Sequence, residues 1–92
     1  MYSGLEAVVS GRVQMVMFRD FTRRKALKLG VVGEIKNRPD GTVAVYAEGS
    51  EETLEKFVEF LKRGSAFSRV DNVAYTFVYP RGGFDSFFIK YT

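Results

Sequence analysis

Apolar and polar residues alternate in five stretches of the chain, and alternation with a period of two is typical of β-strands. In the first stretch, residues 5–13, one face carries Leu5, Ala7, Val9 and Gly11. The other predicted strands cover residues 31–37, 42–48, 70–79 and 87–91. The second and third strands are joined by Arg38-Pro39-Asp40-Gly41, and Pro-Asp-Gly between two such runs is typical of a hairpin.

Two stretches have the spacing of amphipathic helices. The first runs from Phe18 to Leu29 and is predicted to end at Gly30, the usual residue after a helix C-terminus. The second is predicted to begin after Ser50, which can cap it, and to end at Gly64. Its apolar residues recur at i, i+3, i+4 and i+7, which is the clearest helical pattern in the chain: Leu54, Phe57, Val58 and Leu61.

The order of these elements is βαββαβ with one extra strand. That order predicts an α+β fold of the ferredoxin-like type, an antiparallel sheet of four strands plus a short fifth, with two helices on one face. The short chain, 92 residues, predicts a single domain over residues 1–92.

The composition excludes several kinds of site. The chain has no cysteine and no histidine, so thiolate metal sites, cysteine nucleophiles and imidazole general bases are absent. Hydrophobic residues make up 46% of the chain, which is enough for a core and excludes disorder. The net charge of +3 favours anionic partners only mildly. No signal peptide and no membrane-length apolar run is visible, and the default expectation is a reduced cytoplasmic setting.

Two segments carry candidate chemistry. Residues 11–19 lie between a predicted strand and a predicted helix, where backbone N–H groups and the helix dipole favour an anion. Arg19, in the first helical turn, can place two donors over the same anion, although most arginines are simply solvated surface charges. Asn37 stands at the end of a strand before a turn, where Asn is ordinarily a turn former.

These two segments closely resemble the paired signatures of the acylphosphatase family. The first family motif, G-x-V-Q-G-V-x-F-R, is matched by Gly11, Val13, Gln14, Val16, Phe18 and Arg19. The second motif is matched in spacing by Gly33, Asn37, Gly41, Val43 and Gly49. Phe87–Tyr91 is similar to the family's final strand, so the resemblance spans essentially the whole chain.

The resemblance implies hydrolysis of the carboxyl–phosphate bond of small acyl phosphates by direct attack of water, without a cofactor, a metal or a phosphoenzyme. Arg19 would bind the phosphoryl oxygens and Asn37 would hold the water. The backbone of the preceding loop would cradle the phosphate, with the residues Val13, Gln14, Met15, Val16, Met17 and Phe18. Inorganic phosphate would be product and competitive inhibitor, and we expect a monomer with no nucleic-acid or membrane partner.

Met15 departs from the family motif, which has Gly at this position. Glycine permits a positive φ or a close backbone approach to the phosphate, and a non-Gly residue at positive φ costs roughly 1–2 kcal/mol. The sequence therefore leaves an alternative open, a non-catalytic phosphate- or anion-binding module of the same fold whose activity is reduced by Met15.

Two further alternatives have weak support. The same element order serves RNA-recognition modules, but the predicted strand 42–48 contains one Tyr and no basic residue, so it lacks their base-stacking motif. A metal site could be sought among Glu48, Glu51, Glu52 and Glu55. Glu51 and Glu55, however, form an ordinary i, i+4 pair on a solvated helix face.

Overall fold

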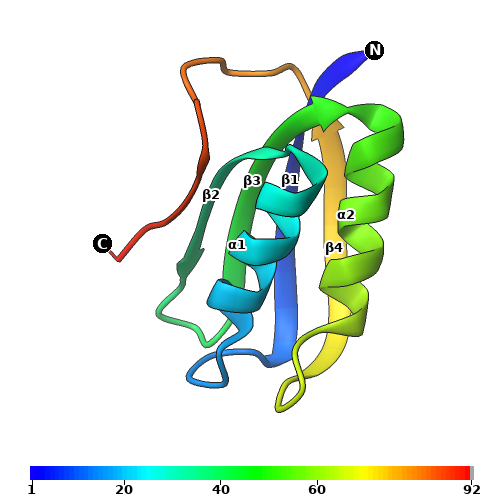
Figure 1. The fold of residues 1–92 in the computed structure, drawn as a ribbon. Helices are drawn as coiled ribbons and strands as arrows, with labels where there is room; N and C mark the ends of the chain where they lie inside the picture. Colours follow the sequence, from blue (N-terminus) through cyan, green and yellow to red (C-terminus); the bar gives the residue numbers. More distant parts are fainter. Residues whose placement is uncertain (92) are drawn as a thin grey trace.

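The computed structural model describes residues 1–91, and these fold into seven elements in the order β1-α1-β2-β3-α2-β4-β5 (Figure 1). The strands are β1 (Tyr2–Arg12), β2 (Val32–Asn37), β3 (Val43–Ser50), β4 (Arg69–Val78) and β5 (Phe87–Ile89). The helices are α1 (Phe18–Leu29) and α2 (Glu51–Arg63). All seven elements were predicted from the pattern of apolar positions. The bounds of α1 agree to the residue, and no strand end differs by more than three residues.

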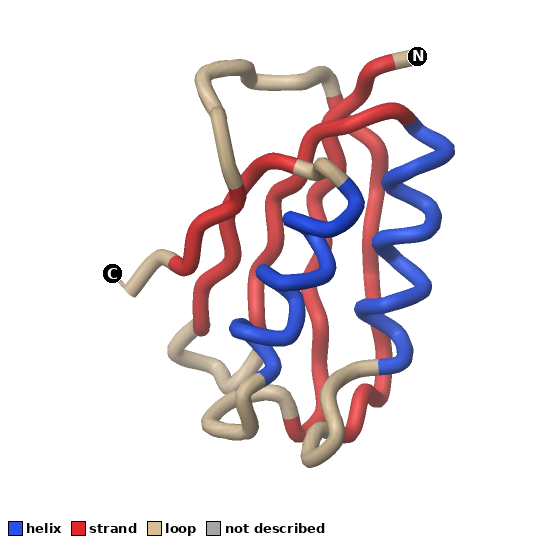
Figure 2. The backbone as a smooth tube through the Cα atoms, in the orientation of Figure 1, coloured by secondary structure: helices blue, strands red, loops and turns tan. Residues whose placement is uncertain are grey.

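The strands form one sheet in the order β4-β1-β3-β2-β5. The first four strands pair antiparallel, and both helices cover the same face of the sheet, which confirms the ferredoxin-like architecture (Figure 2). The fifth strand departs from the antiparallel expectation, because β5 pairs parallel with β2. The chain leaves β4 at one edge and crosses the end of the sheet through residues 79–86, so it reaches the far edge running in the direction of β2 (Figure 1).

Local signals explain where the helices begin and end. The hydroxyl of Ser50 accepts a hydrogen bond from the Thr53 N–H at 3.1 Å, which caps α2 as predicted. Gly30 ends α1 at φ 74°, a left-handed conformation that costs glycine little. Each helix buries its apolar stripe against the sheet. The core between the two layers includes Leu5, Val9, Phe18, Ile35, Val45, Leu54, Phe57, Leu61 and Phe87.

A buried carboxylate holds the crossing segment to the sheet at the end where β4 finishes. Glu48 on β3 is 2% exposed and accepts hydrogen bonds from the Tyr46 hydroxyl at 2.6 Å, the Gly82 N–H at 2.8 Å and the Tyr2 hydroxyl at 3.2 Å. Burial raises the pKa of Glu48, but these hydrogen bonds outweigh it and the net pKa lies below the ordinary value. The weakly supported acidic site around Glu48 is not formed, and Glu51 accepts a hydrogen bond from the Ser3 hydroxyl instead. Within residues 1–91, no group of three or more potential ligands is arranged to hold a metal ion.

The sheet face that the helices leave open carries a shallow depression of about 680 Å³. Its lining is mixed in charge and includes Glu6, Glu34, Lys36, Tyr46, Arg81 and Lys90. Arg81 lies 3.8 Å from the centre of the Tyr46 ring and 3.5 Å from the Glu6 carboxylate, so its charge is already partnered. Neither helix in residues 1–91 has the length and apolarity needed to cross a bilayer.

Candidate active site

The predicted site residues lie at one end of the sheet, where three loops meet: residues 13–17, 38–42 and 64–68 (Figures 1 and 2). The first loop contacts each of the other two. The Gln14 side-chain amide donates to two backbone carbonyls of the 38–42 loop, and the Ser65 hydroxyl donates to the Val16 carbonyl at 3.0 Å. These contacts fix the 13–17 loop from both sides.

Gly11 directs the chain into this loop. The register between β1 and β4 shifts between Ser10 and Gly11, which is a β-bulge. Gly11 has φ 122°, and a Cβ at this position would collide with the Arg69 carbonyl oxygen on β4. Only glycine fits this backbone position, which accounts for the first Gly of the motif in structural terms.

The backbone of the loop alternates in the sign of φ. Met15 has φ 60° and Met17 has φ 63°, and they are the only non-glycine residues of 1–91 with positive φ. Such alternation turns successive N–H groups toward one side, which creates an anion-binding concavity known as a nest. The side chains of Val13 and Phe18 anchor the two ends of this stretch in the core, whereas Met15 is 97% exposed. Of the two reasons for a glycine at this position, the structure shows the first, since Met15 adopts a positive φ.

The N–H groups of this stretch have no acceptor within residues 1–91. The first bond of α1 runs from the Phe21 N–H to the Met17 carbonyl, which leaves the N–H groups of residues 18–20 without helical partners. Met17 at the helix N-cap offers no side-chain cap, in contrast to Ser50 of α2. The N–H groups of residues 15–17 also donate to no described backbone carbonyl. The six consecutive N–H groups of residues 15–20 thus lie at the N-terminus of α1 without acceptors among the described residues. The helix dipole is positive at this end, so the arrangement is suited to an anion.

Arg19 adds a full positive charge beside these donors. Its guanidinium carbon lies 5.1 Å from the centre of the Tyr91 ring, a cation–π distance. Arg19 makes no ion pair with any carboxylate of residues 1–91. The Lys90 N–H donates to the Ile35 carbonyl at 2.8 Å, and this bond carries the chain past β5 so that Tyr91 reaches α1.

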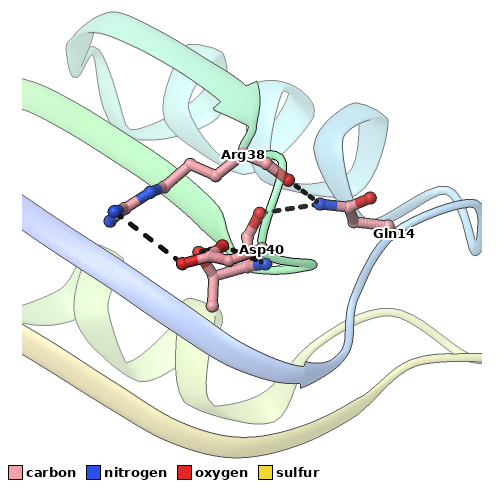
Figure 3. Close-up of polar contacts among 4 residues, drawn as sticks. Gln14, Arg38 and Asp40 are labelled. Atoms are coloured by element: carbon pink, nitrogen blue, oxygen red, sulfur yellow. Dashed lines mark hydrogen bonds and ion pairs between the residues drawn. The ribbon is translucent and has the colours of Figure 1, made fainter.

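Asn37 is the last residue of β2, and its side-chain Oδ1 is buried without a hydrogen-bond partner in residues 1–91. It does not form the following turn. Asp40 does so, because its carboxylate accepts from the Thr42 N–H at 3.0 Å and from the Thr42 hydroxyl at 2.6 Å (Figure 3). A buried acceptor that lacks a protein donor is suited to a water molecule. The Thr22 hydroxyl on α1 is also buried and unpartnered among the described residues.

The structure brings the predicted residues together and adds contacts that the sequence did not predict. Residues 13–19 form one continuous stretch, and the side chain of Gln14 links that stretch to the hairpin that carries Asn37 (Figure 3). The Gln14 side-chain bonds, the stacking of Tyr91 on Arg19 and the unpartnered Thr22 hydroxyl were not predicted. Gln14 and Tyr91 both stand in the quoted motifs, which was the one available signal for them.

Comparison with known proteins points to one family. The family model described as Acylphosphatase matches residues 5–89. An acylphosphatase of Archaeoglobus fulgidus is 52% identical over 69 residues, which are 75% of this chain and 78% of that protein. An acylphosphatase of Dehalococcoides mccartyi is 42% identical over 88 residues, 95% of this chain and 97% of that protein. The crystal structure of acylphosphatase from Bacillus subtilis superposes with a TM-score of 0.93 at 42% identity, over 99% of this chain and all of that one.

The similarity is thus not confined to the two motifs. It runs from the first strand to the last and covers these relatives over most or all of their length. We conclude that the chain belongs to the acylphosphatase family.

Proposed function

We propose that this member of the acylphosphatase family hydrolyses small acyl phosphates with residues 13–18, Arg19 and Asn37 as its catalytic site. Family membership makes the chain an acylphosphatase hydrolase acting on the carboxyl–phosphate bond. The assignment of roles to individual residues is supported chiefly by one observation. Six consecutive backbone donors, residues 15–20, lie unpaired beside an arginine that has no ion-pair partner within residues 1–91.

In the proposed reaction the phosphoryl oxygens accept hydrogen bonds from these N–H groups and from the Arg19 guanidinium. Charge on the three phosphoryl oxygens is stabilised in the transition state by donors that are already in place. Arginine stays cationic and presents two parallel donors that match a phosphoryl group. The protein therefore supplies orientation and electrostatic stabilisation and forms no covalent bond with phosphorus.

Asn37 would orient the attacking water. Its unpartnered Oδ1 accepts a hydrogen bond from the water, which directs the oxygen lone pair at phosphorus. The new bond forms between the water oxygen and phosphorus while the bond from phosphorus to the acyl oxygen breaks, releasing a carboxylate. The protons of the water pass to the phosphate product and to solvent. An amide does this without adding a negative charge beside the phosphoryl group, as a carboxylate would.

The alternative, a non-catalytic anion-binding module, is not supported. The relatives that cover the chain most fully are acylphosphatases, and the loop takes up the positive φ values despite Met15. The proposal also makes four predictions: inhibition by phosphate, a monomeric state, a single domain over residues 1–92 and a cytoplasmic setting.

The test combines acetyl phosphate hydrolysis with thermal melting in inorganic phosphate. Phosphate should inhibit competitively, and at 100 times its Kd should stabilise the fold by about 2.7 kcal/mol. Arg19→Ala should abolish both effects, whereas Lys28→Ala, which removes one positive charge from the last turn of the same helix, should preserve them. If phosphate still stabilises the Arg19→Ala protein, the anion site lies elsewhere.

A second set of variants tests Asn37. Asn37→Ala should lower kcat by roughly 10²–10³-fold with KM and phosphate affinity nearly unchanged, since the amide acts in the transition state. Asn37→Asp should not restore kcat. An Asn37→Ala enzyme that keeps most of its kcat would remove Asn37 from the mechanism.

A further inference from the structure

The side-chain amide of Gln14 joins the two halves of the candidate site. Its Nε2 donates to the Arg38 carbonyl and to the Thr42 carbonyl, both at 2.8 Å (Figure 3). A primary amide has two N–H donors, and both are used here. Within residues 1–91, these are the only side-chain hydrogen bonds between the 13–17 loop and the 38–42 loop.

The hairpin does not need Gln14 in order to form. The Arg38 carbonyl already accepts from the Gly41 N–H at 3.1 Å, and the Thr42 carbonyl already accepts from the Arg38 N–H at 2.8 Å. Gln14 therefore uses the second lone pair of each oxygen. The turn is closed further by the Asp40 carboxylate. Loss of the Gln14 bonds would leave the hairpin folded but separate it from the 13–17 loop.

The residues on either side of these bonds are those on which the proposed reaction depends. Gln14 directly precedes Met15, the first positive-φ residue of the loop, and Arg38 directly follows Asn37. The Gln14 amide thus links the phosphoryl-binding loop directly to the residue that follows Asn37. The loop it restrains holds two non-glycine residues at positive φ, which an unrestrained chain would relax.

We propose that Gln14 is a positioning residue for the hydrolysis, and that its amide sets the water held by Asn37 in line with the phosphoryl group on the 13–17 loop. This inference rests on the proposed roles of the loop and of Asn37. In-line attack is sensitive to placement, and a displacement of about 1 Å can cost on the order of 100-fold in rate.

The experiment measures kcat, KM and phosphate affinity for Gln14→Met and Gln14→Glu with acetyl phosphate. Both replacements have nearly the length of glutamine, but neither offers two N–H donors. We expect Gln14→Met to lower kcat by about 10–100-fold while KM and the Kd of phosphate change less than about threefold. Asp40→Ala is the matched control, since it removes side-chain contacts to Arg38 and Thr42 within the same hairpin but keeps the Gln14 amide and both acceptor carbonyls. It should lower Tm and change kcat less than about twofold.

The pH profile of Gln14→Glu gives a readout that a purely structural role would not produce. At neutral pH its carboxylate would face two carbonyl oxygens and repel them. The two facing carbonyl oxygens disfavour the ionised form and raise the pKa of this carboxyl above its usual value of about 4.3. Once protonated, the group can donate one hydrogen bond, so kcat should rise as the pH falls from about 8 towards 5. The wild-type kcat should vary little over this range, because the chain has no histidine and no cysteine.

A double-mutant cycle tests whether Gln14 affects kcat through Asn37. In the Asn37→Ala background, Gln14→Met should lower kcat less than about twofold, because the water is no longer held there. An unchanged kcat in Gln14→Met, or a full loss of rate in the Asn37→Ala background, would overturn the inference while leaving the proposed function in place. A wild-type enzyme without turnover of acetyl phosphate, or an Asn37→Ala enzyme with full kcat, would overturn both.

Discussion

Replacing Met15 with glycine tests whether the active-site loop stores backbone strain. Met15 adopts φ 60° with its side chain 97% exposed, so Met15→Gly removes almost no packing. Relief of the left-handed conformation should add roughly 1–2 kcal/mol to the free energy of unfolding. The greater freedom of glycine in the unfolded chain should subtract about 0.4–1 kcal/mol. The net expectation is a gain of about 0–1.5 kcal/mol, with kcat/KM equal to or above that of the wild type.

Thermal and urea unfolding measure this difference, and a gain of 1 kcal/mol would raise Tm by about 4–8 °C in a domain of this size. Ala66→Gly is the matched control, because Ala66 is an exposed loop residue outside the positive-φ region. It carries the same entropic cost without relief of strain and should lose about 0.4–1 kcal/mol. If Met15→Gly destabilises the protein as much as Ala66→Gly, the strain argument is wrong. A loss of activity would mean that the loop is adapted to methionine.

Three further substitutions address other parts of the structure. Tyr91→Ala should weaken phosphate binding about two- to fivefold by calorimetry, the equivalent of about 0.5–1 kcal/mol for an exposed cation–π contact, and Tyr91→Phe should retain it; equal affinities in all three proteins would contradict a role for the ring. Leu61→Ala should lower the free energy of unfolding in urea by about 2–5 kcal/mol, because Leu61 is fully buried between α2 and the sheet; a change below that range would show that the core collapses around the gap. Hydrogen bonds from the Thr42 hydroxyl and then the Thr42 N–H hold the pKa of Asp40 below its ordinary value of 3.8. The stability that Asp40 adds relative to Asp40→Ala should therefore be complete above pH 3.8 and be lost as the pH falls below it, and a Tm difference that grows with acid would contradict this sign.

The parts of the fold that local signals encode were predictable. The bounds of α1 follow from its apolar spacing and from Gly30, and the turn between β2 and β3 follows from Pro39, Asp40 and Gly41. The pairing of β5 was not predictable in the same way. Its direction depends on where the chain crosses after β4, and no residue within Phe87–Ile89 records that path.

In the candidate site, too, the local features were predictable and the long-range contacts were not. Residues 13–19 are contiguous, so their motif and the strand-to-helix junction identified them together. The Gln14 bonds join residues that are 24 and 28 positions apart, and the ring of Tyr91 reaches Arg19 only because β5 lies beside β2. Spacing along the chain cannot show such contacts, because tertiary packing creates them.

The position of β1 has a consequence for synthesis on the ribosome. β1 is made before the other four strands of this sheet, yet it lies inside the sheet, between β3 and β4. Translation from Arg12 to Arg69, where β4 begins, takes on the order of 3–11 s at about 5–20 residues per second. Until then one edge of β1 has no native partner strand. The core-facing side chains of Leu5, Ala7 and Val9 also stay exposed until α2 (Glu51–Arg63), which packs on this face, has been made. The nascent chain therefore presents an open apolar strand for seconds, and such a segment is prone to aggregate or to be bound by chaperones.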